Sequence, residues 1–234
     1  MEAKPIKMSF WLRPLQFEGT KMHANVLLMC KLMLLLIIAH HFFDKIEDPF
    51  IPFLKPMDWF HNVPGLFEYT LKIAFIIFSF GLFFNFKVRT SAIALGTIIL
   101  LVLLASKPYF NNHTFIIGCA LFLAGLTNNK QPPYLLIYQI ALVYLGASIN
   151  KMFDPEWWSG AFMHTWLNDA RENPIYITVA NWLPSMTLAK FLSWVAMATE
   201  FLIGITLLIK KYRTKSIWFI ILFHFLLFSL TSFR

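Results

Sequence analysis

Seven apolar blocks dominate this sequence and limit what it can fold into. They cover residues 24–43, 66–86, 91–106, 114–127, 134–151, 189–209 and 216–233. A helix that crosses a bilayer needs about 20 mostly apolar residues, and inside lipid a helix satisfies its own backbone N–H and C=O groups. The pattern therefore predicts an all-α, multi-pass transmembrane bundle of about seven helices. The third and fourth blocks are short, so a re-entrant hairpin is the alternative for these two.

Composition agrees with a chain that is solvated by lipid. Of the 234 residues, 58% are hydrophobic and 14% are charged, whereas about a quarter of the residues of a soluble domain are charged. The net charge of +8 does not predict nucleic-acid binding, because the basic residues lie in short segments between apolar blocks. Cys30 and Cys119 both fall inside apolar blocks, where we expect them to act as small packing residues.

The placement of Lys and Arg predicts the orientation in the membrane, because cytoplasmic loops are enriched in both. A cytoplasmic N-terminus and seven crossings put more basic residues inside than outside. The inside segments hold Lys4, Lys7, Arg13, Lys21, Lys87, Arg89, Lys130, Lys210, Lys211, Arg213 and Lys215. The outside segments hold Lys45, Lys55, Lys107, Lys151, Arg171, Lys190 and Arg234. The two long connections, 44–65 and 152–188, then both lie on the non-cytoplasmic side of the membrane, which is the cell membrane if the protein is bacterial.

Two regions follow from this organisation. Residues 1–23 are expected to form a cytoplasmic N-terminal segment, and no cleavable signal peptide is visible in it because charged residues interrupt any apolar core. Within it, residues 8–17 mix apolar side chains with Arg13, so an interfacial helix and a purely topogenic role are both open. Residues 24–234 are expected to form a single transmembrane domain.

Four ionisable residues lie inside the apolar blocks, where a charge is costly and needs a partner or a purpose. They are Lys31, Lys72, Glu200 and His224. Lys72 is expected to extend its amine toward the outer surface. Glu200 and His224 lie on consecutive helices at similar depth, so we predict a hydrogen bond between them. Such a contact is either a buried structural pair or part of a proton path.

The most distinctive local feature is the end of the fifth block. Lys151 closes an apolar helix there and is followed by an acidic turn, then Trp157 and Trp158, then Gly160. A second polar cluster, Asn111-Asn112-His113, is expected at the same membrane level. An amine and an imidazole at one level are a candidate base and hydrogen-bond donor. The alternatives are a lysine at the lipid interface and a helix N-cap at the asparagines.

Other site chemistries lack the residues that they need. The sequence has no H-E-x-x-H and no C-x-x-C pattern, so we expect no metal site. It also has no glycine-rich phosphate loop and no nucleophile elbow.

These motifs resemble a known family over residues 66–233. Asn111-Asn112-His113, the Lys151–Gly160 stretch, Glu200 and Phe223-His224 together are similar to the membrane domain of vitamin K-dependent γ-glutamyl carboxylases. That domain is also called the horizontally transferred transmembrane (HTTM) domain. The resemblance implies a reduced vitamin K or another quinol as cofactor, and a lyase that carboxylates glutamate.

The resemblance also implies roles for individual residues. Lys151 would be the catalytic base that deprotonates the quinol, and His113 would stabilise the anion that forms. The pocket for substrate and cofactor would include Asn111, Asn112, Trp157, Trp158, Glu200 and His224. Besides the lipid bilayer and the quinone, the partner would be a peptide or protein substrate at the outer face.

Two other function classes stay open on the sequence. One is a quinone-linked membrane oxidoreductase subunit similar to the small DoxX-type proteins. The other is a non-catalytic membrane scaffold. Lys151 and His113 in one cleft would favour an enzyme, whereas a lipid-facing Lys151 would favour the scaffold.

Overall fold

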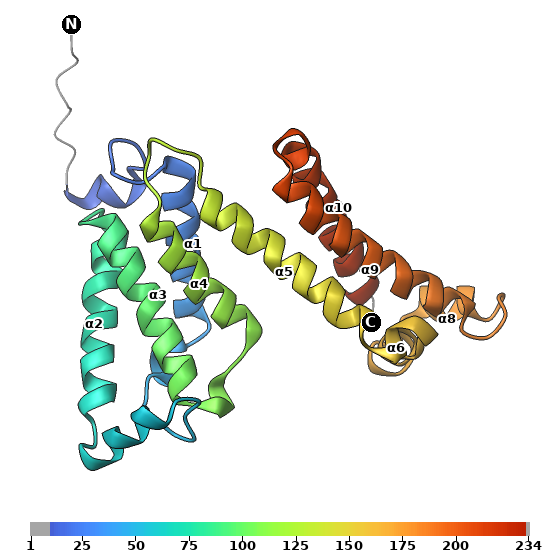
Figure 1. Cartoon of the computed structure of the whole chain (residues 1–234), viewed down its shortest axis with the longest axis horizontal. Helices are drawn as coiled ribbons and strands as arrows, with labels where there is room; N and C mark the ends of the chain where they lie inside the picture. Colours follow the sequence, from blue (N-terminus) through green and yellow to red (C-terminus); the bar gives the residue numbers. More distant parts are fainter. Residues whose placement is uncertain (1–9, 233–234) are drawn as a thin grey trace, which may run out of the picture. The chain divides into compact units, whose positions relative to one another are not determined.

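The described residues form helices joined by turns and loops. The structure is a computed structural model that describes residues 10–232 (Figure 1). Within that range it contains no strand, and its one β-bridge joins Phe50 to Ser106. The predicted all-α fold is confirmed.

Each apolar block contains one long helix. These helices are α1 (Ala24–Ala39), α2 (Leu66–Phe83), α3 (Val88–Ala105), α4 (Asn112–Leu126), α5 (Tyr134–Met152), α9 (Thr187–Leu208) and α10 (Arg213–Ser232). Five are long and apolar enough to cross a membrane: α2, α3, α5, α9 and the stretch Lys210–Leu230 that contains most of α10. The helix of the third block, α3, begins before the predicted block, at Val88, and is therefore long enough to cross a membrane. Helices α1 and α4 are shorter.

Short helices occupy the connections. The 3-10 helices are η1 (Phe10–Leu15), η2 (Phe42–Lys45), η3 (Lys55–Asn62), η4 (Lys107–Tyr109) and η6 (Lys210–Tyr212). The long connection after α5 contains α6 (Pro155–Ser159), α7 (Ala161–His164), the π-helix η5 (Thr165–Ala170) and α8 (Pro174–Ala180). Of the expected interfacial helix over 8–17, residues 8 and 9 lie outside the described range. The rest contains η1, with Trp11 and Leu15 exposed.

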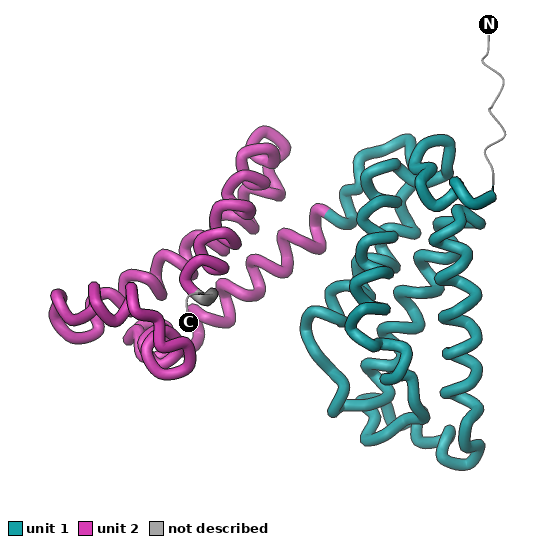
Figure 2. Tube along the Cα trace, turned by 180° about the vertical axis from the view of Figure 1, so that it is seen from behind, with its two compact units in different colours: residues 1–136 teal, residues 137–234 magenta. Residues whose placement is uncertain are grey.

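The chain divides into two compact units, residues 1–136 and 137–234 (Figure 2). They are called unit 1 and unit 2 below, and each is described by itself. The single domain expected over 24–234 stays a prediction.

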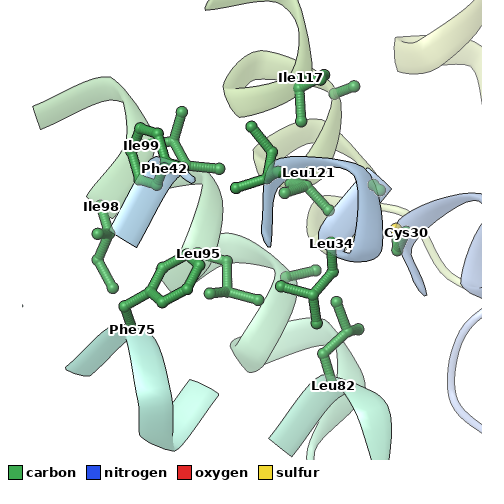
Figure 3. Close-up of a cluster of buried hydrophobic side chains, with 14 of the residues drawn as sticks. Cys30, Leu34, Phe42, Phe75, Leu82, Leu95, Ile98, Ile99, Ile117 and Leu121 are labelled. Carbon is green, nitrogen blue, oxygen red and sulfur yellow. The ribbon is translucent and has the colours of Figure 1, made fainter. Parts of the chain in front are cut away.

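Unit 1 is a four-helix bundle of α1–α4 around one apolar core. Its fully buried members include Leu34, Leu82, Leu95, Ile99 and Leu121, whose side chains point toward one another (Figure 3). Small residues let α3 and α4 approach closely, as membrane helices commonly do. A Cβ added to Gly96 would lie 2.5 Å from the backbone nitrogen of Phe122. Cys30 and Cys119 are both free, with Cys30 buried in this core, as expected for packing residues.

Hydrogen bonds gather the connections of unit 1 at two opposite ends of the bundle. At one end, the Asn85 amide donates to the carbonyls of Arg13 and Gln16, and Arg89 donates to the carbonyls of Gly125 and Leu126. This end holds the segments that were predicted to be cytoplasmic, and it is called the basic end below.

The other end of unit 1 holds the long connection between α1 and α2. The backbone N–H of Phe50 donates to the carbonyl of Ala105, and the Tyr109 hydroxyl donates to Glu47 at 2.8 Å. This bond with the carboxylate of Glu47 raises the pKa of Tyr109 above its ordinary value. Successive helices of alternating direction place every second connection at the same end of a bundle, and the connections of unit 1 follow that arrangement. The side of the membrane that each end faces stays a prediction.

The two lysines inside the apolar blocks of unit 1 both have partners. Lys31 donates to the carbonyl of Pro14 at 2.7 Å and lies over the ring of Phe17, so it fastens the N-terminal segment to α1. Lys72 donates to Glu68 at 2.6 Å, one turn nearer the start of α2. That start belongs to the predicted outer end, so the ammonium extends in the direction expected from the sequence.

Unit 2 consists of α5 from Ile137 onward, α9 and α10, together with the folded connection between α5 and α9. The buried residues Met163, Leu167 and Tyr176 of this connection pack against Ala189 and Ala196 of α9. Burial raises the pKa of Tyr176, and the negative charge of Asp169 adds to that effect. The connection is therefore a packed part of the unit and not a loose loop.

Asn173 fastens that connection to the rest of unit 2. The residue is fully buried, caps α8 by accepting from the N–H of Tyr176, and donates to the carbonyl of Leu230 in α10. Asn173→Ala removes a helix cap and takes a donor away from the partly buried carbonyl of Leu230. We expect a loss of about 2–4 kcal/mol in the free energy of unfolding. The measurement is thermal unfolding of the purified protein in detergent.

Asn181→Ala is the matched control, because Asn181 is an exposed residue just after α8. It should shift the unfolding temperature by much less. An equal loss of unfolding temperature in both variants would show that Asn173 does not attach the connection to α10.

Candidate functional site

One face of α5 carries the polar groups of unit 2. Tyr144, Ser148 and Lys151 follow at steps of four and three residues, which places them on the same side of a helix. Ser148 is fully buried and donates to the carbonyl of Met197 in α9 at 2.8 Å. Close packing brings the two helices together, since a Cβ added to Gly204 of α9 would lie 2.6 Å from Leu145. The polar face of α5 is therefore turned toward α9.

Lys151 forms an ion pair with Glu200 of α9. The side chain of Lys151 is 21% exposed and that of Glu200 is 9% exposed, so the pair is largely but not completely buried. One carboxylate oxygen of Glu200 accepts from the ammonium. The other oxygen, Oε2, is buried and has no hydrogen-bond partner among the described residues. This oxygen is therefore free to accept a further hydrogen bond.

His224 has a different partner from the one predicted. Its Nε2 lies 2.7 Å from the hydroxyl of Tyr144, and no hydrogen bond joins it to Glu200 within the described range. The predicted Glu200–His224 contact is wrong. Their partners on α5 are seven residues apart, about 10 Å along the helix, so the two side chains sit at different levels. Glu200 on α9 and His224 on α10 each pair with a residue of α5 instead.

The segment after Lys151 puts an aromatic ring against the ammonium. Asp154 caps α6 by accepting from the N–H of Glu156, and Pro155 occupies the first turn, as expected for a helix start. This short turn brings the ring of Trp157 to 4.7 Å from the Lys151 ammonium. Trp158 is half exposed and donates to the carbonyl of Met152. The tryptophans predicted near the site are thus close to Lys151 in sequence, and Trp157 also in space.

The predicted Asn111-Asn112-His113 cluster lies in unit 1. Asn111 caps α4 by accepting from the N–H of Thr114 at 2.9 Å, which is the alternative foreseen for it. Asn112 and His113 are exposed, and the His113 ring lies 6.2 Å from that of His40. Because Lys151 belongs to unit 2, the shared cavity of Lys151 and His113 stays a prediction. Within residues 10–232, no group of three or more His, Cys, Asp or Glu could hold a metal ion.

Sequence reasoning missed Tyr144, although it is a member of the polar cluster. It lies two turns before Lys151 on the same helix face, and this spacing was the available signal. Tyrosine is common in this chain, which has seven, so the type of residue alone does not mark a site. The contact with His224 is what distinguishes Tyr144.

One comparison with protein families found a match. A family model, described as the HTTM domain, covers residues 131–233. This part of the chain matches the HTTM domain. The HTTM match contains Lys151, Trp157, Glu200 and His224, but it is shorter than the resemblance inferred over 66–233 and leaves out Asn111-Asn112-His113. No curated protein and no solved structure matches the chain. The HTTM match and the long apolar helices together identify an integral membrane protein.

Proposed function

We propose that unit 2 carries a proton-transfer site of a carboxylase-like membrane enzyme that uses a reduced quinone. Lys151 is the general base, and the Glu200 carboxylate accepts the proton that the lysine must lose first. The Lys151–Glu200 ion pair carries this proposal. A lysine is basic only as the free amine, and a carboxylate within hydrogen-bond distance gives its proton a place to go.

The free oxygen of Glu200 fits the hydroxyl group of such a substrate. Oε2 is buried and lacks a donor among residues 10–232, and a hydroxyl would supply one. A reduced quinone, when bound, brings an acidic hydroxyl and two electrons. The Trp157 ring, which lies beside Lys151 and is stacked on Phe162, makes the surroundings of the ammonium aromatic, and the position inside a membrane protein suits a molecule that partitions into lipid.

The Tyr144–His224 pair extends the polar cluster away from Lys151. Both groups donate and accept protons, and they lie 2.7 Å apart. Because no hydrogen bond among residues 10–232 joins this pair to Glu200, we propose it as a polar contact that holds α10 against α5 beside the site. His113 as the anion stabiliser, and glutamate as the substrate that gains a carboxylate, belong to the same proposal and come from the resemblance to the carboxylases.

The proposal is tested with membranes that contain the full chain. They are mixed with reduced quinone, isotopically labelled bicarbonate and a glutamate-containing peptide, and quinol loss and peptide mass are followed by mass spectrometry. We expect quinol loss that depends on Glu200. Glu200→Gln keeps the shape of the side chain but cannot take a proton from Lys151, so turnover should fall roughly 100-fold or more.

Glu172→Gln provides the control, because Glu172 is exposed in the connection between η5 and α8. Full turnover in this variant is expected. If quinol is lost but the peptide gains no labelled carboxylate, the function would be quinol chemistry on another substrate. Absence of any quinol loss in the unmodified protein would favour the scaffold.

A further inference from the structure

The basic end of unit 1 contains a cavity that the proposed function does not use. It has a volume of about 890 Å³ and lies between the N-terminal segment, the turn from α2 to α3, and the start of α3. Four basic residues line it, namely Arg13, Lys21, Lys87 and Arg89. No acidic residue is among the described residues that line it. Glu18, the acidic residue nearest in sequence, is exposed outside the lining.

Two of these four cations have no partner in the described part of the chain. Arg89 bonds to the carbonyls at the end of α4, and Arg13 lies over the rings of Phe10 and Phe86. No hydrogen bond or ion pair within residues 10–232 involves the ammonium groups of Lys21 and Lys87, and both residues are exposed. The start of α3 also lines the cavity and lacks a side-chain cap, which leaves N–H groups for an anion.

An apolar groove adjoins this cavity. It has a volume of about 390 Å³ and is lined by Leu34, Leu35, Ile38, Ser79, Phe80, Phe83 and Phe84. Phe84 lines both hollows. It is stacked on Phe10 on one side and on Phe80 on the other, at 4.7 and 5.8 Å between ring centroids. A positive cavity and an apolar groove with a common wall match the two parts of a phospholipid.

We propose that unit 1 binds an anionic phospholipid, with its phosphate in the basic cavity and an acyl chain in the groove. The groove selects a lipid over a free phosphate, because a free phosphate has no apolar part to place there. The exposed Trp11 and Leu15 on η1, beside the cavity-lining Arg13, suit a position at the membrane interface. Basic pockets between membrane helices are known to hold such headgroups.

Lipid binding to the purified full chain tests the proposal. After delipidation in detergent, phosphatidylglycerol and phosphatidylcholine with the same acyl chains are titrated and read by native mass spectrometry. Phosphatidylglycerol should bind at least tenfold more tightly. The double variant Lys21→Gln/Lys87→Gln should weaken it by roughly 20- to 30-fold and change phosphatidylcholine binding little. Both lysines are exposed, so this variant should fold.

Lys210→Gln/Lys211→Gln is the matched control, since it removes the same charge from exposed residues of unit 2. It should leave phosphatidylglycerol binding unchanged. Leu35→Trp puts a bulky side chain into the groove at a half-exposed position and should weaken phosphatidylglycerol several-fold. Equal binding of the two lipids, an equal loss in the control, or equal competition by inorganic phosphate would overturn the phospholipid site.

Discussion

Lys151→Arg is expected to abolish quinol turnover while the protein stays folded. Arginine keeps the positive charge and can still pair with Glu200, but it does not lose its proton and cannot act as a base. General base catalysis contributes roughly 100- to 10,000-fold to a rate, so turnover should fall by at least the lower figure. The measurement is the quinol assay on membranes that contain equal amounts of each protein. Turnover within a few-fold of the unmodified protein would exclude Lys151 as the base.

Lys190→Arg is the matched control for this change. Lys190 is an exposed residue near the start of α9, in the same unit, and its replacement should leave turnover intact. Lys151→Ala is a less informative variant, because it leaves Glu200 buried without its cation. Removing one partner of a buried ion pair costs about 3–5 kcal/mol, so lost activity there could reflect lost structure. The arginine variant separates the two effects.

Gly96→Ala is expected to cause a large loss of stability in unit 1. The added Cβ would lie 2.5 Å from the Phe122 nitrogen and 2.6 Å from the Gly118 oxygen. Both are backbone atoms of α4, so a rotamer change cannot relieve the clash and the helices must separate. Overpacking typically costs about 1–3 kcal/mol, and a contact with backbone should reach the upper part of that range. Thermal unfolding in detergent should shift down by about 5 °C or more.

Gly146→Ala makes the same chemical change where there is room. No atom lies within 4 Å of a Cβ built on this residue, and alanine favours a helix over glycine by about 1 kcal/mol. The variant should therefore be as stable as the unmodified protein or slightly more stable. A Gly96→Ala protein that unfolds at the temperature of Gly146→Ala would contradict the close α3–α4 packing.

Local hydrophobicity predicted the secondary structure because length and apolar content decide whether a segment can cross a bilayer. All seven apolar blocks contain the expected helix. The same argument found Glu200 and His224, because an ionisable group in an apolar block stands out wherever the helix packs. It also marked Lys151 and the tryptophans that follow it. These features depend on the order of residues along one helix and need no knowledge of its neighbours.

The pairing of these residues depends on tertiary structure. Glu200 and His224 were expected to meet because their helices are consecutive. In the structure, each finds a partner on α5, Lys151 and Tyr144 respectively. The close contact of Gly204 with Leu145 brings α5 and α9 together with Lys151 at the level of Glu200. Hydrophobicity sets neither the axial shift nor the rotation of a helix, so the sequence could not predict the pairs.

The rotation of a membrane helix about its own axis does not follow from hydrophobicity, for a physical reason. Lipid and protein core are both apolar, so the residues that face them look alike in sequence. In α1, Leu34 is 2% exposed and Leu32 is 57% exposed, yet both are leucines two positions apart. The sequence by itself determined that the chain has seven apolar helices, and it marked Lys151, Glu200 and His224. Only the tertiary structure decided which helix faces turn inward, and hence that Lys151 pairs with Glu200 and that the basic end of unit 1 encloses a cavity.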